Sequence, residues 1–562
     1  MASIDPPSTP NPRRSRDALL FAALWFPYAL LVQRFWFVTD DAYISFRYAR
    51  NLTHGLGLRY NAGEEPPVEG YSNFLWTLYA ALIEALGLDV GFWAALLSAA
   101  CGSLLLWLVY RALVDALGVD RPIAGLATLS LGCFPPFAVW STGGLETMPF
   151  ALALFVTFER LVLRRAGVDP VGGALAALAL ALLRVEGIAW AVVVGLLAAF
   201  TRARAGPHAA RPLLRCALLL FAGYAVYYAW RFSYYGLPFP NTVYAKSGFG
   251  AEVAARGARY LISALLTFLP IAPLLGCAAV LDRRWRTVGP AVAAMLFGVA
   301  AFAVLVGGDF MAMGRFLVPG LPFQALLFGL LLQRVAEAAP QPRAAAALVA
   351  AVSIAISLLP AFDVHVVPAS IRDRFHFRYN ADTPRSEYEQ WVSMNENARL
   401  WRGKGLALRA IAEPGDSVVL DAIGIVGYYS DLHVFDRLGL VDREVATQRQ
   451  GAAQLRSPGH DRYVGPLFFL DRNPTFLEAL FLIGDRLAPE VLAREAQRWL
   501  VSPAADRYAP DFRIARDGDE YAPSLLLVWR SGPQDAAVRW ERFFARARTI
   551  DWERLRAPAP AR

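Results

Sequence analysis

A dense group of acidic, basic and histidine residues follows the first apolar run of the chain. Asp40 and Asp41 stand where this run ends, and His54 and Glu69 follow in the same polar stretch. Carboxylates at the boundary of a membrane span are costly to desolvate, so they are usually kept for a function. The stretch also contains basic residues whose guanidinium groups can bind an anion, namely Arg34, Arg47, Arg50 and Arg59. This combination predicts chemistry on a lipid-linked phosphate; the alternative is a solvated loop whose two aspartates cap a helix.

Three later polar loops have the same mixture of glycine and charged residues. They contribute Glu146, then Asn241 and Lys246, then Asp309 and Arg315. The basic residues of these loops are expected to hold a phosphate. The acidic residues are expected to bind sugar hydroxyls or to balance charge. Each residue taken singly has the alternative role of a helix cap or an interfacial anchor.

A break between two short apolar stretches adds another charged pair. Residues 172–183 and 187–200 are each too short to cross a bilayer upright, and Arg184 and Glu186 lie between them. Short broken helices with charges at the break tend to line a cavity. Arg184 therefore joins the basic loop residues as an expected phosphate ligand, with Glu186 beside it in the substrate site. The alternative is an Arg–Glu pair that closes a hairpin.

The composition sets the class of protein. The chain is 56% hydrophobic and only 18% charged, its mean hydropathy is +0.37, and a soluble protein carries more charge. Apolar stretches recur through the first 360 residues and then stop, which predicts a polytopic α-helical membrane protein with a soluble tail. About eleven spans are expected, at 18–34, 91–110, 122–140, 145–163, 172–183, 187–200, 213–233, 259–281, 288–307, 315–333 and 343–360.

Arginine clusters between these spans predict the topology in the plasma membrane. They fall on one side if residues 73–87 form a juxtamembrane helix and do not cross. The N-terminus is then cytoplasmic, with residues 1–17 disordered, and residues 18–360 form the membrane domain with a first outward loop at 35–90. Residues 361–562 form an extracytoplasmic domain. The net charge of +8 is spread over short loops, which excludes a nucleic-acid partner.

The tail has the patterns of a small α/β or α+β domain. Residues 417–421 and 524–529 resemble buried strands, and residues 395–411 and 489–500 have helical periodicity. Gly424-Ile425-Val426-Gly427 follows the first of these strands, but it is only half of a dinucleotide fingerprint and is discounted.

The sequence requires no cofactor. The four cysteines lie in apolar segments without paired spacing, so neither a disulfide framework nor a zinc site is implied. A divalent cation is left open and no metal site is predicted. The oligomeric state is not predicted.

Several motifs carry a family resemblance over roughly residues 18–440. The run D-D-A-Y-I-S-F-R-Y-A-R-N-L, followed by G-L-G-L-R-Y-N and V-E-G-Y-S-N-F-L-W, resembles the terminal arabinofuranosyltransferase family of mycobacterial cell-wall assembly. The segments G-G-L-E-T, L-R-V-E-G, Y-G-L-P-F-P-N-T-V-Y-A-K and G-G-D-F-M are similar to that group as well. More broadly, the chain resembles membrane glycosyltransferases of the GT-C fold.

The resemblance implies transfer of D-arabinofuranose from a polyprenyl phosphate to a glycan outside the membrane. The acidic position that opens the family's first loop maps to Asp40 or Asp41 as the general base, with Glu69 in reserve. His54, Glu69, Tyr71 and Asn73 are counted among the substrate-binding residues. The alternatives are a GT-C transferase with another lipid-linked sugar or with a protein or lipid acceptor, and a flippase for lipid-linked sugars. Transporters usually have repeated halves, and none are seen here.

Overall fold

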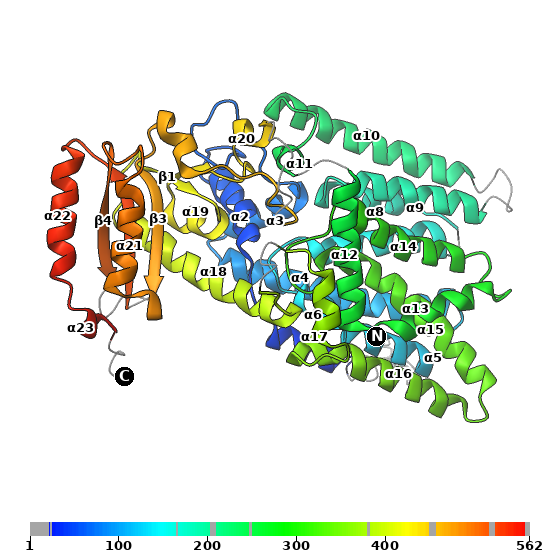
Figure 1. Ribbon diagram of the computed structural model, residues 1–562. Coiled ribbons are helices and arrows are strands. Elements are labelled where there is room, and N and C mark those ends of the chain that lie inside the picture. The colour runs from blue at the N-terminus through cyan, green and yellow to red at the C-terminus, as the bar shows by residue number, and fades with distance from the viewer. Residues whose placement is uncertain are drawn as a thin grey trace, which may run out of the picture. The chain divides into compact units, whose positions relative to one another are not determined.

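A computed structural model describes residue 22 and residues 25–164, 167–202, 210–246, 250–378, 383–448, 457–515 and 523–556. The predicted disordered segment 1–17 lies outside these residues. The chain forms two compact units, which we describe separately (Figure 1). The helical unit comprises residues 1–37, 94–227 and 249–391, and the mixed unit comprises residues 38–93, 228–248 and 392–562. This division differs from the predicted domains, because the first loop belongs to the same unit as most of the tail.

The helical unit follows the apolar runs of the sequence. A helix covers residues 25–34. The labelled elements are α5 (Arg121–Gly132), α6 (Pro135–Val139), α7 (Thr147–Phe158) with the π-turn η2 (Glu159–Leu163), α8 (Pro170–Leu183), α9 (Gly187–Arg202), α12 (Ala251–Phe268), α13 (Ile271–Leu275), η5 (Gly276–Leu281), α14 (Gly289–Leu305), η6 (Arg315–Gly320), α15 (Leu321–Ala338), α16 (Pro342–Leu358), η7 (Leu359–Phe362), α17 (Ala369–Arg372) and η8 (Asp373–Phe375), together with the π-turn η1 (Ala112–Ala116). Helices α4 (Val90–Arg111), α10 (Ala210–Tyr235) and α18 (Glu387–Arg409) have residues in both units.

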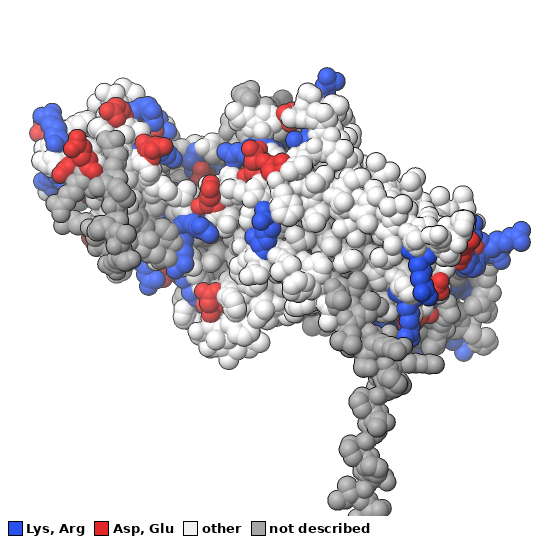
Figure 2. All heavy atoms as spheres, turned by 90° about the horizontal axis from the view of Figure 1, so that it is seen from below, with Lys and Arg blue, Asp and Glu red and all other residues white. Residues whose placement is uncertain are grey.

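Every predicted span contains a helix, but the helices differ in length. Within the described residues, four are long and apolar enough to cross a membrane: Val90–Ala116, Ala210–Tyr235, Arg315–Ala338 and Pro342–Phe362. The pair Ala251–Phe268 and Ile271–Ala278 passes the same test together and is bent by 113°. Leu269 has a positive φ of 44°, and Pro270 after it lacks the N–H that a continuing helix needs. Figure 2 shows a broad white area of the surface without charged side chains. The Lys, Arg, Asp and Glu side chains visible in this view lie outside that area.

The mixed unit combines helices of the first loop with the tail. Its elements are α2 (Asp40–Thr53), α3 (Phe74–Ala85), α11 (Asn241–Ala245), β1 (Ser417–Leu420), α19 (Gly424–Ser430), β2 (His433–Asp436), α20 (Arg443–Thr447), η9 (Pro466–Arg472), β3 (Phe476–Ile483), η10 (Gly484–Arg486), α21 (Pro489–Leu500), β4 (Tyr508–Ala515), β5 (Ser524–Ser531), α22 (Ala536–Arg548) and α23 (Trp552–Arg556). The predicted strands at 417–421 and 524–529 and the predicted helices at 395–411 and 489–500 are thus confirmed.

A five-stranded sheet forms the centre of the mixed unit, in the order β2-β1-β3-β5-β4 (Figure 1). Strand β1 is parallel to β2 and β3, with Ser417 opposite His433, whereas β5 is antiparallel to β3 and β4. Alternate residues of β5 pack on opposite faces: Leu525 and Leu527 against α21 and α22, and Leu526 and Val528 on the α2 and α19 side. The sequence of β5 is therefore a nearly continuous apolar run, because both faces of the strand are buried.

Candidate functional site

The acidic pair lies in the first turn of α2. Asp40 and Asp41 are both half-buried. Negative charge at this position is favoured by the partial positive charge of a helix N-terminus. The residue before them, Thr39, makes no side-chain capping bond to α2. Asp40 makes side-chain contacts outside its own helix.

The carboxylate of Asp40 binds the N-terminus of α19. Its Oδ2 accepts a hydrogen bond from the backbone N–H of Gly424 at 3.1 Å, and its Oδ1 accepts one from Ile425 at 2.6 Å. A Cβ atom on Gly424 would lie 1.9 Å from the backbone carbonyl oxygen of Asp40. Helices α2 and α19 lie side by side (Figure 1). The glycine after β1 thus allows α2 to approach, and the N–H groups that would bind a phosphate in a nucleotide fold bind Asp40.

Arg47 fixes the same pair of helices from about two turns further along α2. It is 3% exposed, and its guanidinium donates hydrogen bonds to the backbone carbonyls of Tyr60, Gly427 and Leu432 at 2.8, 2.7 and 2.6 Å. A Cβ on Gly427 would lie 2.0 Å from the hydroxyl of Tyr60. Arg47 therefore holds the fold around the acidic turn, instead of binding an anion as the sequence suggested.

The surroundings of Asp40 raise its pKa to about 7. Burial of the carboxyl is the largest cause, and the negative charge of Asp41 adds to it. The two N–H donors of α19 oppose this effect because they stabilise the ionised form. The acidic turn therefore contains a carboxyl that changes its protonation state near neutral pH.

Glu69 and Tyr71 lie in the interior of the mixed unit. Both Glu69 oxygens accept hydrogen bonds from Arg231, at 3.2 Å from Nε and 2.5 Å from the terminal nitrogen, and both partners are under 5% exposed. The hydroxyls of Tyr71 and Tyr235 hydrogen-bond to each other at 3.1 Å within the core, and Tyr235 donates to the carbonyl of Leu58. These contacts favour a structural role for two residues that the sequence assigned to substrate.

Asn73 and Asn241 also join chain segments in the interior. The Oδ1 of Asn73 accepts hydrogen bonds from the hydroxyls of Ser45 on α2 and Thr77 on α3, at 3.0 and 3.2 Å. The amide of Asn241 donates to the carbonyls of Gly439 and Leu440 at 2.8 and 3.0 Å. Both side chains are at most 5% exposed.

His54 and Lys246 are exposed instead. His54 caps the C-terminal end of α2, about 20 Å along the axis from Asp41 at 1.5 Å per residue. His54 and Asp41 are therefore too far apart to act on one reacting bond. Lys246 follows the short helix α11.

In the helical unit, the structure brings together a second group of predicted residues. Arg184 binds Glu146 at 2.6 Å and Glu186 at 2.5 Å, and all three side chains are under 20% exposed. Each glutamate precedes a helix N-terminus, of α7 and α9 respectively. Gly187 permits the break because a Cβ there would lie 2.0 Å from the carbonyl oxygen of Leu180. The expected Arg–Glu pair of the hairpin is present, and it extends to Glu146 from another helix.

The loop after α14 supplies the second ion pair of this group. Arg315 Nε binds Asp309 Oδ2 at 2.5 Å, and Asp309 also acts electrostatically on Arg184. The loop is fixed from outside, because the indole N–H of Trp140 donates to the carbonyl of Ala312 at 3.0 Å.

A buried ion pair holds the same loop from its other side. Arg378 donates to the carbonyl of Phe310 at 2.8 Å, and Glu387 accepts the N–H of Met313 at 2.6 Å. Arg378 and Glu387 also bind each other at 2.9 Å. The conformation of the loop is therefore set by side chains distant in sequence.

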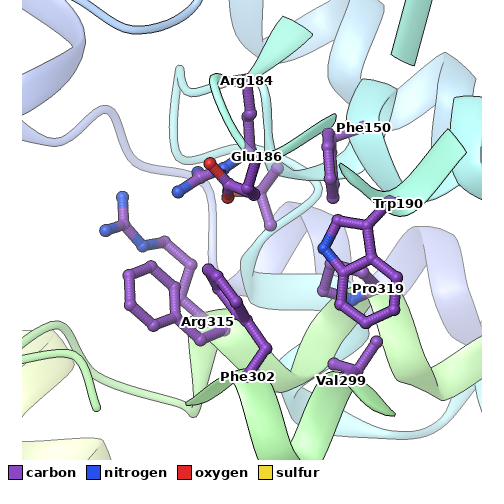
Figure 3. Close-up of a pocket in the computed structure, with 10 residues that line it drawn as sticks. Phe150, Arg184, Glu186, Trp190, Val299, Phe302, Arg315 and Pro319 are labelled. Carbon is purple, nitrogen blue, oxygen red and sulfur yellow. The ribbon is translucent and has the colours of Figure 1, made fainter. Parts of the chain in front are cut away.

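A narrow pocket, open to solvent, lies beside these ion pairs (Figure 3). The charged side chains of Arg184, Glu186 and Arg315 gather at one end of the view, and Trp190 and Val299 lie at the other. The full lining is Thr147, Phe150, Arg184, Glu186, Trp190, Val299, Phe302, Arg315, Phe316 and Pro319.

Comparisons with known proteins identify the fold. The crystal structure of ArnT from Cupriavidus metallidurans bound to undecaprenyl phosphate matches with a TM-score of 0.54 and 13% identity, over 92% of this chain and 99% of that one. The apo structure of the same protein gives 0.53 and 14%, over 93% and 100%. The chain has the GT-C fold. As a GT-C protein with apolar helices of spanning length, it is a multi-pass membrane protein.

Other comparisons are more limited. The cryo-EM structure of the arabinofuranosyltransferase AftD from Mycobacteria aligns with 92% of this GT-C chain and 40% of its own, with 15% identity and a TM-score of 0.48. A family model described as a domain of unknown function, DUF8728, matches residues 388–527. No curated protein matches the sequence.

Sequence reasoning missed three residues that the GT-C structure places at these sites. Gly424 was read only as part of an incomplete nucleotide motif. Thr147 and Trp190 line the pocket, and each follows a predicted residue, Glu146 directly and Glu186 after one helical turn. For Trp190 that spacing was the available signal, because residues one turn apart share a helix face.

No group of three or more His, Cys, Asp and Glu side chains within the described ranges is arranged to hold a metal ion. Cys101, Cys133, Cys216 and Cys277 are all free thiols.

Proposed function

We propose that this protein is a glycosyltransferase that moves D-arabinofuranose from a polyprenyl-phosphate donor to a glycan acceptor at the outer face of the plasma membrane. The observation that carries this proposal is the acidic turn of α2, held by α19 in a chain of GT-C fold. ArnT has the same fold and was crystallised with undecaprenyl phosphate, which supports a lipid-linked donor. The choice of sugar rests on the motif resemblance.

Asp41 is the general base in this proposal, and Asp40 is a positioning residue. Each carboxylate oxygen of Asp40 already accepts a backbone N–H from α19. The next residue on a helix points about 100° away around the axis, because one turn takes 3.6 residues. Asp41 is therefore turned away from the contact that occupies Asp40.

The reaction is a substitution at the anomeric carbon of the donor sugar. An acceptor hydroxyl oxygen forms the new bond to this carbon while the bond to the phosphate oxygen breaks. The hydroxyl proton passes to the carboxylate of Asp41, and polyprenyl phosphate leaves with its negative charge. The leaving group requires no general acid, since the pKa of its conjugate acid is low. Lys246 is retained as a ligand for the departing phosphate oxygens.

The topology belongs to the same proposal. About eleven segments cross the membrane, several of them as short or broken helices, and the N-terminus is cytoplasmic. Residues 361–562 lie outside, where a lipid-linked donor and a cell-wall glycan would meet.

The purified full-length protein tests this function. It would be supplied with synthetic polyprenyl-phosphoryl D-arabinofuranose and an arabinan oligosaccharide, and products would be detected by mass spectrometry. We expect one pentose to be added to the acceptor by the wild type, and the Asp41→Asn variant to transfer it far more slowly. Transfer only from donors that carry another sugar would contradict the arabinose assignment. Movement of the lipid across vesicles without any transfer would instead support a flippase.

A further inference from the structure

The charges beside the pocket of the helical unit compensate one another. Arg184 has two carboxylate partners, Glu146 and Glu186, and Arg315 has Asp309. A phosphodiester brought to either guanidinium would lie next to these carboxylates. The local charge therefore does not attract an anion, although both arginines were predicted as phosphate ligands.

A further guanidinium completes the balance. Arg256 on α12 is 7% exposed and donates to the carbonyl of Gly307, in the same loop as Asp309. With this residue included, guanidiniums and carboxylates are equal in number around the loop. Such an environment suits an uncharged ligand that both accepts and donates hydrogen bonds, because each hydroxyl can find a charged partner.

The remaining walls are aromatic and aliphatic. Trp190 and Phe302 meet with ring centroids 6.2 Å apart, and Phe302 and Phe316 with centroids 6.1 Å apart. Arg184 and Arg315 lie over Phe316 at 5.6 and 5.1 Å, which keeps the charged end in contact with the aromatic end. A sugar ring has the matching character, with an apolar C–H face and a polar rim of hydroxyls.

One buried hydroxyl in the pocket lacks a hydrogen-bond partner. Thr147 is 3% exposed, and its Oγ1 forms no hydrogen bond among the residues that the structure describes. Buried polar groups without partners are rare in native proteins and call for an explanation. Because Thr147 lines the pocket, a bound ligand is a direct source of the missing partner.

The geometry points to this pocket as a binding subsite for a single uncharged sugar ring, which stacks on Trp190 and hydrogen-bonds to Thr147, Glu186 and Arg315. This assignment rests on the proposed function, and it places recognition of the sugar, not of the lipid phosphate, in the helical unit. The ring can come from the donor or from the end of the acceptor.

Three variants and a matched control test the subsite. Thr147→Val keeps the shape of the side chain and removes a hydroxyl that makes no internal bond, so the fold should be unaffected. Thr157→Val is the control on the same helix α7, where the hydroxyl donates to the carbonyl of Ala153 and takes no part in the pocket. Trp190→Leu removes the stacking surface, and Trp190→Phe retains part of it. Binding of methyl arabinofuranosides and of inorganic phosphate would be measured on the full chain in detergent by saturation-transfer NMR.

We expect glycoside binding to weaken about 2- to 10-fold in Thr147→Val, as for the loss of one neutral hydrogen bond. It should weaken more in Trp190→Leu, recover in part in Trp190→Phe, and stay unchanged in Thr157→Val. Phosphate should not compete. The assignment is overturned if the wild type binds no glycoside at millimolar concentration, or if Thr147→Val and Trp190→Leu bind it normally. Competition by phosphate would show that the pocket binds an anion, and this result would also overturn the assignment.

Steady-state kinetics show whether the bound ring comes from the donor or from the acceptor. They also test the subsite separately from the proposed transferase activity. A rise in the donor KM of Thr147→Val would identify the donor sugar, and a rise in the acceptor KM would identify the acceptor. Glycoside binding without any transfer would retain the subsite and refute the transferase. Transfer that is insensitive to the pocket variants would retain the transferase and refute the subsite.

Discussion

A Cβ atom on Gly424 would lie 1.9 Å from the backbone carbonyl oxygen of Asp40, although 384 positions separate these residues in the chain. The approach is between backbones, so no side-chain rotation can relieve it. It allows the carboxylate of Asp40 to accept two N–H groups of α19. The tail therefore takes part in positioning the acidic turn of the first loop.

Gly424→Ala should separate α2 from α19. The added methyl group meets a backbone atom, so the helices must move apart and the hydrogen bonds to Asp40 must lengthen. We expect strong destabilisation and loss of sugar transfer, measured by thermal unfolding and by the product assay. Gly465→Ala is the control, because a Cβ there meets nothing within 4 Å. Equal behaviour of the two variants would contradict the close approach.

Asp40→Asn and Asp41→Asn should fail in different ways. The amide of Asn at position 40 accepts only one of the two N–H groups and presents a donor to the other, so amide exchange in residues 424–430 should accelerate. Asn at position 41 should leave this exchange unchanged and lower turnover by roughly 10²- to 10⁴-fold, as for the loss of a general base. Hydrogen–deuterium exchange and steady-state turnover would be compared. A normal turnover in Asp41→Asn would transfer the base role to Asp40.

Stability should decrease between pH 5 and pH 8 through Asp40. Its folded-state pKa of about 7 is above the ordinary value near 3.8, so the folded protein binds more protons than the unfolded chain in this interval. The stabilising effect is complete below the ordinary pKa and is lost as pH rises through about 7. We expect the wild type to lose about 1–2 kcal/mol more than Asp40→Asn, allowing for partial solvent exposure. Chemical unfolding at both pH values measures this difference, and identical losses would contradict it.

Glu69→Gln should destabilise the mixed unit rather than act on catalysis alone. It leaves the buried guanidinium of Arg231 without its carboxylate, which typically costs about 3–5 kcal/mol. Asp115→Asn provides the exposed control, because Arg111 and Asp115 are both about half-exposed and such pairs contribute about 0.3–0.5 kcal/mol. Unfolding free energies would be compared. If the Glu69→Gln protein has normal stability but no activity, Glu69 acts on the substrate and its structural role is contradicted.

Reporter fusions test the topology. A fusion after residue 360 should be active only with a reporter that functions outside the cytoplasm, because the arginine clusters predict an outward tail. A fusion at the N-terminus should report the cytoplasm. The opposite result after residue 360 would place the acidic turn on the wrong side for a cell-wall acceptor.

Local patterns were enough to locate the apolar helices and two strands of the sheet, β1 and β5. The stretch 524–529 was predicted as a buried strand because a strand covered on both faces needs no polar alternation, and β5 confirms this. The break at Arg184 and Glu186 was also visible, because a charged pair interrupts two short apolar runs. The polytopic helical class could be predicted for the same reason, because the length and hydropathy of each apolar run can be read from residue order. The GT-C fold was expected from the motif resemblance, and the structural matches bear it out.

The roles of the polar residues were decided by the tertiary structure. Arg47 and Glu69 have the side-chain chemistry of substrate ligands, and the sequence could not reveal that one binds three backbone carbonyls and the other a buried arginine. The two glycines after β1 resembled a nucleotide motif until α2 was found against them. The role of a charged side chain is set by its partner, and here Arg231 lies 162 positions from Glu69 and Gly427 lies 380 positions from Arg47. Residue type and local spacing determine which groups can do chemistry, whereas long-range packing determines which of them are already occupied.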